Sequence, residues 1–406
     1  MKGGKVLLVT SNLPPVLGGS GVVYENLAQF SDGQIIVIAP RRSYYDRLPL
    51  IGWREHDRFA PYRVVRLALI RSPLLLHRPR LLIKAKLAFA ETVIRLQLIS
   101  CLLRLIIAES PVAICIGELI ANGWLIVLLR RLGLRSHVLV YVHGEEITTD
   151  DPYDSEHRRA RRALMSAGKI VVVSKFTREA VKELIGIADP NPICLIENGV
   201  DNKRFKPTTK RPDLIEAYGL KNSFVFVSVC RLLKKKGIDR AIEAFAEVAR
   251  SDPSCRYLIV GTGPYQSALQ DLAGHVGMAD KIIFAGAVAD DDLVAHYALG
   301  DVFLMPNRTL ADGDTEGFGL VFLEANACGL PVIAGRDGGS LDAVLNEYSG
   351  IVVDGRLVGE IASSMLRLRN DKPLRERLRR GGRELAAAAD WREKVKEFLR
   401  IATDSK

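Results

Sequence analysis

Short apolar runs rich in β-branched residues alternate with longer stretches of helical periodicity along the whole chain. These runs are apolar on both faces, which is typical of strands in parallel sheets that helices cover on each side. In the first half we predict strands at residues 5–10, 34–39, 62–68, 112–117, 137–142 and 169–173. In the second half we predict strands at residues 223–229, 256–260, 281–285, 301–305, 331–334 and 350–353.

The series of strands restarts near residue 220, after a stretch from Asn198 to Pro212 that is rich in Pro, Asn, Lys and Thr. The pattern therefore predicts an α/β fold of two doubly wound, Rossmann-like domains with a hinge near residues 196–208. We assign residues 1–200 to the first domain and 201–390 to the second. Ligands of such sheets bind beyond the carboxyl ends of the strands, so the loops after the strands are where chemistry is expected.

The composition is that of an ordinary globular protein. A chain of 406 residues with 48% apolar and 26% charged residues is neither disordered nor collagen-like. Its six scattered cysteines form no C-x-x-C pair, so we expect small buried side chains in a reducing compartment rather than disulfides or a zinc site. The first apolar run is too short for a signal peptide, and no stretch approaches the roughly 18 apolar residues of a membrane span. We expect a cytoplasmic protein.

The net charge of +10 indicates anionic partners. Nucleic acid, a membrane surface and a phosphorylated small molecule all fit a basic protein, and composition alone does not choose among them.

A glycine cluster, Gly18-Gly19-Ser20-Gly21, follows the first predicted strand and precedes a helical pattern that starts at Val22. Glycines at such a turn let backbone N–H groups approach an anion, although a tight turn without a ligand explains them equally well. The G-x-G-x-x-G fingerprint is absent here and at Gly261-Thr262-Gly263, which argues against a nicotinamide or flavin enzyme.

A basic loop follows the strand predicted at 223–229. Arg231 and Lys236 lie five residues apart between this strand and a helix that starts near Ile238, and they could converge on one phosphorylated group. We interpret Lys234 and Lys235 as a solvated charge run.

The segment 312–335 carries two glutamates with the spacing E-x7-E, Glu316 and Glu324. Between them Gly317-Phe318-Gly319 opens a helix, whose free N–H groups favour negative charge by about 0.3–1 kcal/mol. Glu316 precedes this helix and Glu324 lies more than one turn inside it. Two carboxylates so placed can accept hydrogen bonds from different hydroxyls of one polyol ligand.

Taken together, these motifs resemble those of the retaining glycosyltransferases of family 4, which have the GT-B fold. The resemblance covers most of the chain. The matching motifs, in order, are Gly18-Gly19, Val142-His143-Gly144, Val173-Ser174-Lys175-Phe176-Thr177, Asn198-Gly199-Val200-Asp201 through Phe205, Arg231 with Lys236, Val260-Gly261-Thr262-Gly263, and Glu316 with Glu324. Within the family, residues 305–335 are most similar to bacterial mannosyltransferases of the phosphatidylinositol mannoside type.

The resemblance implies a role for each donor-site residue. Arg231 and Lys236 would hold the donor diphosphate and neutralise it as it leaves. Glu324 would bind the ribose hydroxyls, and Glu316 the hydroxyls of the donor sugar. His143 would contact the transferred hexose from the other domain.

Glycines and backbone groups complete the implied donor site. The N–H groups of Gly317, Phe318 and Gly319 would touch the sugar and phosphate, with Leu320 and Gly263 in the same donor-binding set. The Gly18-Gly19 loop would approach the phosphate or the acceptor.

The family usually transfers the sugar on the front face with retention and without a metal, which implies no cofactor beyond the nucleotide-sugar donor. We therefore interpret Asp312-Gly313-Asp314, which mimics a D-x-D metal motif, as a polar loop. One departure is Ser340-Leu341-Asp342, where the family often has Pro-Glu after two glycines. The resemblance also implies a last helix, at 391–406, that packs back on the first domain.

The sequence indicates the acceptor-binding residues less clearly than the donor-binding ones. Residues 61–110 hold only two acidic residues, Glu91 and Glu109, beside nine basic ones and a long helical pattern rich in Leu and Ile. The nine are Arg63, Arg66, Arg71, Arg78, Arg80, Lys84, Lys86, Arg95 and Arg104. A second basic cluster comprises Arg158, Arg159, Arg161 and Arg162. A basic amphipathic helix can lie on an anionic membrane, but packing against the sheet explains the same pattern.

The leading hypothesis is a glycosyltransferase that moves a hexose to a glycan or lipid-linked acceptor. A sugar-nucleotide epimerase and a nucleic-acid-binding protein are the alternatives, but no nucleic-acid recognition module or aromatic stacking stripe supports the latter. GDP-mannose is the favoured donor, and UDP-glucose or another UDP-sugar remains open. The acceptor remains open among a polyprenyl-linked glycan, a phospholipid and a soluble sugar.

Overall fold

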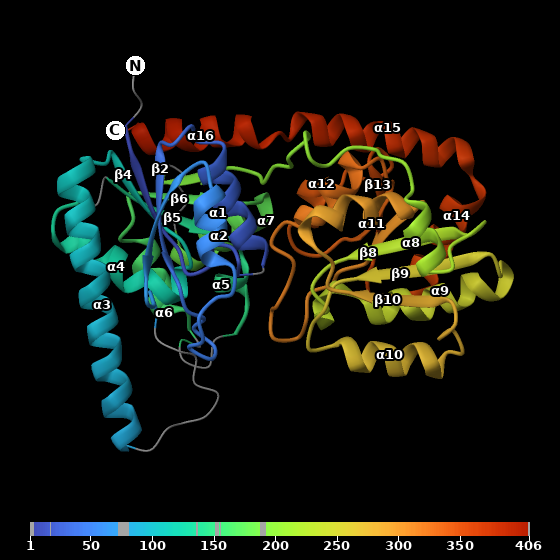
Figure 1. Cartoon of the computed structure of the whole chain (residues 1–406), viewed down its shortest axis with the longest axis horizontal. Helices are drawn as coiled ribbons and strands as arrows, with labels where there is room; N and C mark the ends of the chain where they lie inside the picture. The colour runs from blue at the N-terminus through green and yellow to red at the C-terminus, as the bar shows by residue number, and fades with distance from the viewer. Residues whose placement is uncertain are drawn as a thin grey trace.

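Two parallel sheets lie side by side in the computed structural model (Figure 1). The structure describes residues 4–16, 18–71, 81–134, 137–150, 154, 156–186 and 192–404. The predicted Arg78 and Arg80 lie outside these residues, as does the side chain of Lys84.

The N-terminal sheet has the strand order β3-β2-β1-β4-β5-β6-β7 within the described residues. Its strands are β1 (Val6–Val9), β2 (Ile35–Pro40), β3 (Arg63–Leu67), β4 (Ala113–Ile116), β5 (Val138–Val142), β6 (Lys169–Val172) and β7 (Ile193–Leu195). The helices of this half are α1 (Gly19–Gln29), α2 (Trp53–Phe59), α3 (Leu81–Glu109), α4 (Leu119–Arg131), α5 (Glu145–Thr148), α6 (Arg158–Leu164) and α7 (Lys175–Ile185).

The C-terminal sheet has the strand order β10-β9-β8-β11-β12-β13 in the same described part. Its strands are β8 (Phe224–Val229), β9 (Cys255–Val260), β10 (Ile282–Gly286), β11 (Val302–Met305), β12 (Val332–Gly335) and β13 (Gly350–Val353). The helices are α8 (Pro212–Ala217), α9 (Ile238–Ser251), α10 (Gln266–His275), α11 (Leu293–Leu299), α12 (Leu320–Ala327), α13 (Ser340–Ala343), α14 (Val358–Asn370), α15 (Lys372–Ala388) and α16 (Trp391–Thr403).

Helices cover both faces of the N-terminal sheet, as the two-sided apolar strands predict. On one face, α3, α4, α6 and α7 share a buried apolar cluster with the sheet. On the other face, α1 and α16 belong to a second cluster that continues into the core of the C-terminal half. The fold prediction of two doubly wound units is confirmed.

Every predicted strand occurs within one or two residues of its predicted bounds, but β7 was missed. This strand has three residues and follows Pro192, so neither its length nor its surroundings give a strand signal. The helix predicted from Val22 begins earlier, at Gly19, because the Val22 amide already donates to the Gly18 carbonyl at 3.2 Å. All six cysteines are free.

The last helix, α16, returns from the C-terminal half to pack on α1 (Figure 1). The Phe398 side chain is fully buried there, with its ring centroid 6.2 Å from that of Tyr141 on β5. The Arg392 guanidinium lies 4.7 Å from the ring centroid of Phe30, and Lys169 Nζ donates to the Ile401 carbonyl at 2.9 Å. The chain thus crosses between the two sheets twice. The exact domain boundary at residues 200 and 201 stays a prediction.

Replacing the buried anchor of α16 should loosen this return crossing. We expect Phe398→Ala to lower the free energy of unfolding by about 3–5 kcal/mol, because it removes a fully buried ring and leaves a cavity. Phe59→Ala, at a side chain that is 74% exposed, is the matched control and should change it by about 0.5 kcal/mol or less. Urea unfolding followed by circular dichroism measures both. Equal midpoints for the two variants would contradict the packing described for α16.

Candidate active site

The candidate residues gather at the carboxyl ends of the parallel strands of both sheets. Gly18 and Gly19 follow β1, and His143 follows β5. Arg231 and Lys236 follow β8, Gly263 follows β9, and the loop that carries Glu316 follows β11. This is the edge at which open α/β sheets bind their ligands.

The glycine-rich start of α12 contacts the loop after β5 of the other sheet. A Cβ atom added at Gly317 would lie 1.9 Å from the His143 carbonyl oxygen, so only glycine allows this approach. Next to it, the Asp150 amide donates to the Asp312 carbonyl at 2.8 Å. The structure therefore brings His143 and the E-G-F-G motif together from the two halves of the chain, as the resemblance implies.

Lys236 and Glu316 form an ion pair at this junction. Their side chains are 15% and 13% exposed, so solvent screens the pair weakly. Burial pushes the pKa of the Glu316 carboxyl up, but the charges of Lys236 and Lys235 outweigh it, and the pKa lies below its ordinary value. Glu316 is thus an ionised hydrogen-bond acceptor beside a cation.

Lys235 is buried, and the interpretation of this residue as part of a solvated charge run is wrong. Its Nζ lies 2.7 Å from Asp314, 3.1 Å from Glu145 and 3.1 Å from the Thr315 carbonyl. Burial alone lowers the pKa of Lys235, but the surrounding carboxylates outweigh it and the pKa is raised. The reason is local: the 3-10 turn at Lys234–Lys236 directs Lys235 inward and leaves Lys234 exposed.

Asp342, the departure from the family pattern, also connects the two halves. Its Oδ2 accepts the Lys175 amide at 2.7 Å, and its Oδ1 lies 3.2 Å from Lys175 Nζ. Lys175 opens α7, so a carboxylate from the C-terminal half lies at the positive end of a helix of the N-terminal half.

Glu324 occupies the second turn of α12, eight residues after Glu316. The Tyr297 hydroxyl donates to its Oε2 at 2.7 Å. Burial raises the pKa of the Glu324 carboxyl above its ordinary value. One oxygen is therefore held by the protein, and the other, which has no hydrogen bond within the described residues, can accept one from a ligand hydroxyl.

The remaining predicted residues have different surroundings. Arg231 is exposed, and its guanidinium has no protein partner within the described residues. Gly263 packs closely on the loop after β8, because an added Cβ would lie 2.3 Å from the Leu232 carbonyl oxygen. Gly18 and Gly19 face open space, where an added Cβ meets nothing within 4 Å. Joint binding of one phosphate by Arg231 and Lys236 stays a prediction.

Tyr24, which the sequence did not single out, orients His143. Its hydroxyl lies 2.9 Å from His143 Nε2 and accepts the Glu118 amide at 3.3 Å. Burial lowers the pKa of His143 to about 4, so the imidazole is neutral at pH 7. A Tyr24 proton donated to Nε2 assigns the ring proton to Nδ1, which then serves as a hydrogen-bond donor.

Two further carboxylates near the site, Glu146 and Glu118, were not predicted from the sequence. Glu146 accepts the amides of His143 and Gly144 at 3.1 and 2.8 Å, and burial raises its pKa to about 7. Glu118, at the end of β4, accepts from Thr10 Oγ1 at 2.7 Å and the Ser11 amide at 2.6 Å. Glu146 lies in the short helix α5 and Glu118 directly precedes α4, and an isolated glutamate at such a position gives no sequence signal of its role.

The D-x-D segment does not present two free carboxylates. Asp314 is engaged by Lys235, and the Oδ1 atom of Asp312 accepts the Asp314 amide at 3.1 Å. This loop therefore contributes contacts between the halves, and its interpretation as a polar loop without a metal stays a prediction.

Comparisons with known proteins decide the family. Residues 17–204 match the model of Glycosyltransferase Family 4, and residues 210–385 match that of Glycosyl transferases group 1. The chain is also 33% identical over 98% of both chains to a GDP-mannose-dependent alpha-(1-6)-phosphatidylinositol monomannoside mannosyltransferase of Mycobacterium tuberculosis. The chain belongs to glycosyltransferase family 4. It is a glycosyltransferase, and the resemblance stated from its motifs is confirmed.

Further relatives of the transferase carry related names. An enzyme of Mycolicibacterium smegmatis with the same name as the M. tuberculosis protein is 34% identical over 89% of this chain and 88% of its own. Among solved structures, Anabaena HepE, in complex with UDP and glucose, has a TM-score of 0.76 and 17% identity, covering 99% of this chain and 100% of its own. Sucrose-phosphate synthase of Thermosynechococcus elongatus has a TM-score of 0.75 and 19% identity over 98% of both. These structures establish the GT-B fold.

Removing the charge of Lys235 should weaken the contacts of the glycosyltransferase between this lysine and the carboxylates of Asp314 and Glu145. We expect Lys235→Gln to lower the free energy of unfolding by about 1.5–3 kcal/mol, because it leaves Asp314 and Glu145 without their charged donor. Lys234→Gln is the matched control on the same turn and should change it by about 0.5 kcal/mol or less. Urea titration of both variants measures the difference. If Lys234→Gln were the more damaging change, the inward placement of Lys235 would be wrong.

Proposed function

We propose that this glycosyltransferase transfers mannose from GDP-mannose to a lipid-linked or glycan acceptor, with retention and without a metal. The observation that carries the proposal is the similarity along the whole chain, not only in one half, to GDP-mannose-dependent mannosyltransferases. The C-terminal half carries the donor motifs and the N-terminal half faces the acceptor, so similarity in both halves bears on both substrates.

The leaving diphosphate needs positive charge, and the site offers Lys236, Arg231 and the start of α12. Lys236 is held in place by Glu316, whereas Arg231 is exposed and without a protein partner in the described part of the chain. Preorganised charges of this kind stabilise a developing anion because they need little reorganisation during the reaction. The Asp314 carboxylate is already paired with Lys235. We therefore propose that the cationic side chains and the backbone N–H groups, rather than a metal ion, stabilise the leaving diphosphate.

The transferred sugar would lie between Glu316 and His143. In the step that we propose, the bond from the sugar C1 to the diphosphate oxygen breaks, and the acceptor oxygen bonds to C1 on the same face. The acceptor proton passes to the departing phosphate oxygen. The ionised Glu316 carboxylate accepts hydrogen bonds from the sugar hydroxyls, and the neutral His143 ring donates a hydrogen bond from its N–H group.

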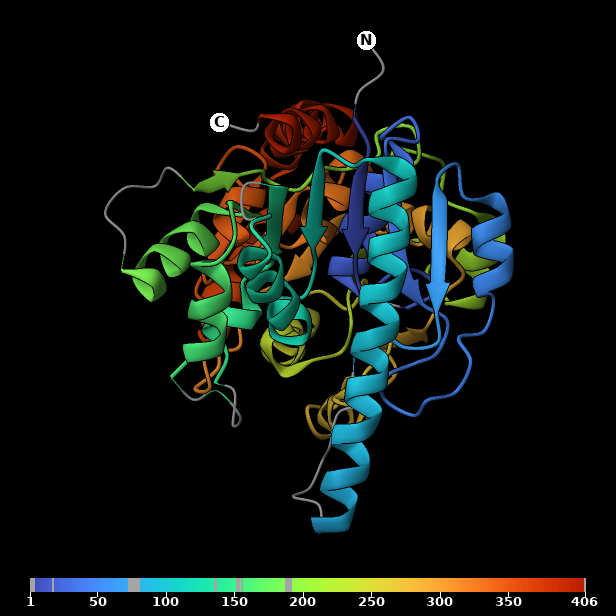
Figure 2. The ribbon, with the colours of Figure 1, turned by 90° about the vertical axis from the view of Figure 1, so that its left-hand side faces the viewer.

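The lipid-linked acceptor is supported by the outer helix α3. Five exposed apolar residues, spaced by three, four or seven positions, share one face of this helix: Phe89, Val93, Leu96, Leu103 and Ile107. Exposed Lys86 and Arg104 border this face. Figure 2 shows α3 on the outside of the N-terminal sheet, extending beyond the sheet at one end. An apolar stripe with a basic border fits an anionic membrane surface.

The described residues include no helix with both the length and the apolar character to cross a bilayer. We therefore propose peripheral contact of α3 with the inner face of the cytoplasmic membrane. The alternative donor, UDP-glucose, has one supporting observation in the fold-related HepE complex with UDP and glucose. That relative is 17% identical, against 33% for the GDP-mannose-dependent enzyme.

Product formation tests the proposal. The purified protein is incubated with GDP-mannose, with and without a phosphatidylinositol mannoside acceptor, and GDP release and product mass are measured. The proposal predicts GDP release only with acceptor, together with a product one hexose heavier. Conversion of the donor without acceptor would favour the epimerase, and transfer from UDP-glucose alone would replace the donor.

Removing either member of the central ion pair should abolish turnover. We expect Glu316→Ala and Lys236→Ala each to lower kcat by about two orders of magnitude or more, since each removes a preorganised charge at the reacting centre. The matched control is the exposed pair Glu393 and Lys396 on α16, whose alanine variants should keep normal activity. Near-normal turnover of the Glu316 or Lys236 variant, with folding verified by circular dichroism, would show that the site lies elsewhere.

Membrane contact predicts sedimentation with anionic vesicles. At low salt we expect the protein to sediment with phosphatidylglycerol vesicles but not with phosphatidylcholine vesicles, and high salt should release it. The double variant Leu96→Gln and Ile107→Gln should sediment less. The control variant Ile51→Gln and Leu357→Gln, at exposed apolar residues elsewhere, should behave like the wild type. Failure of the wild type to sediment would end this part of the proposal.

A further inference from the structure

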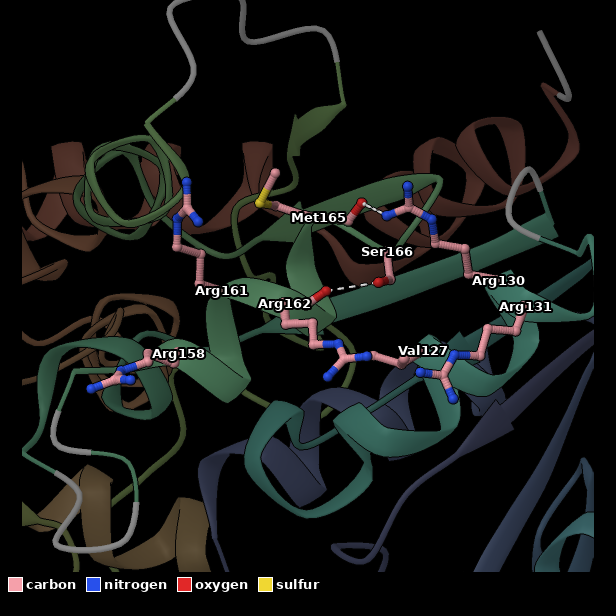
Figure 3. A pocket seen from close by; sticks show the side chains of 8 residues that line it. All are labelled: Val127, Arg130, Arg131, Arg158, Arg161, Arg162, Met165 and Ser166. Atoms are coloured by element: carbon pink, nitrogen blue, oxygen red, sulfur yellow. Dashed lines mark hydrogen bonds between the residues drawn. The ribbon is translucent and has the colours of Figure 1, made fainter.

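A concave, strongly basic surface lies between α4 and α6, outside the candidate active site. The cavity has a volume of about 580 Å³, and five of the residues that line it are arginines. They are Arg130 and Arg131 at the end of α4, and Arg158, Arg161 and Arg162 on α6 (Figure 3).

Most of the residues that line the cavity lie toward the edge of the sheet opposite the active site, although Arg158 lies at the start of α6. The C-terminal ends of α4 and α6 precede the amino ends of β5 and β6, whereas His143 follows the carboxyl end of β5. A ligand in this cavity is therefore distinct from the donor and from the reacting sugar.

Protein contacts explain three of the arginines. Arg130 donates to the Met165 carbonyl at 2.9 Å, and Arg161 to the Leu184 carbonyl at 3.1 Å, so both cap chain segments at helix ends. Arg158 pairs with Glu156 at 2.7 Å.

Arg131 and Arg162 have no such explanation. Neither guanidinium has a hydrogen bond or ion pair within the residues that the structure describes, and Figure 3 shows them on either side of Val127. Both side chains are exposed and line one concave surface, so an anion bound between them would be attracted by two guanidinium groups at once.

We propose that this cavity binds a phosphate-bearing anion between Arg131 and Arg162. Guanidinium groups match phosphate oxygens as planar, two-pronged donors, and two of them from neighbouring helices form a clamp. The carbonyl ends of α4 and α6 carry about half a negative charge each and oppose an anion. Together with Glu156 they do not cancel five arginines, so the cavity remains cationic.

The position of the cavity favours a lipid headgroup as the source of the phosphate. Helices α3, α4 and α6 cover the same face of the N-terminal sheet, so the cavity and the apolar stripe of α3 belong to one layer. This choice of source rests on the membrane contact proposed above, whereas the phosphate site itself does not.

The experiment compares two double variants of equal charge. Arg131→Gln with Arg162→Gln removes the clamp, and Arg380→Gln with Arg383→Gln removes two exposed arginines of α15 as the matched control. One arm titrates sn-glycerol 3-phosphate into each protein by calorimetry. The other measures binding to vesicles of equal parts phosphatidylglycerol and phosphatidylcholine. Circular dichroism and transferase turnover verify that each variant is folded.

We expect the clamp variant to bind at least about tenfold more weakly than the wild type in both arms, and the control variant to stay within about twofold. A loss confined to glycerol phosphate assigns the site to a soluble phosphate ester, and a loss confined to vesicles assigns it to the lipid. If the wild type ignores vesicles but binds glycerol phosphate through the clamp, the membrane contact is wrong and the site stands. Equal behaviour of the clamp and control variants in both arms overturns the proposal.

Discussion

Two adjacent lysines on the turn after β8 hold the site together. Lys235 points inward to Asp314 and Glu145, and Lys236 pairs with Glu316, so one short turn fixes the acidic loop before α12 and contacts the other half of the chain. In the same loop, Gly317 closely approaches the His143 carbonyl oxygen of the other half. Without the two cations, the largely buried Glu316 carboxyl would keep only the effect of burial, which raises its pKa and favours the neutral form over the ionised form that binds sugar hydroxyls.

Periodicity and motif spacing predicted most of this architecture, and the reason is physical. Strands apolar on both faces have few other environments available to them, so β1 to β6 and β8 to β13 were recognisable from sequence. The E-x7-E spacing likewise predicted one glutamate before a helix and one within it. In contrast, the inward turn of Lys235 depends on a carboxylate 79 residues away and on another 90 residues away, which no local pattern contains. The contact of Tyr24 with His143 spans 119 residues and was missed for the same reason.

The positive charge of the chain divides into parts with different surroundings. Lys235 and Lys236 are compensated by carboxylates inside the site, and Arg231 stays exposed beside them. On the outer layer, α3, α4 and α6 carry cations that the described residues compensate less completely, next to exposed apolar side chains. This division suits the proposed donor, which is a small soluble anion, and the proposed acceptor, which belongs to a membrane.

Calorimetric titration of GDP-mannose and UDP-glucose into the purified protein, in buffer containing a chelator, tests the central claim most directly. The account predicts saturable binding of GDP-mannose with one molecule per chain, its loss in Lys236→Ala, and much weaker binding of UDP-glucose. Tighter binding of UDP-glucose than of GDP-mannose, or binding of GDP-mannose that is unaffected by loss of Lys236, would contradict it.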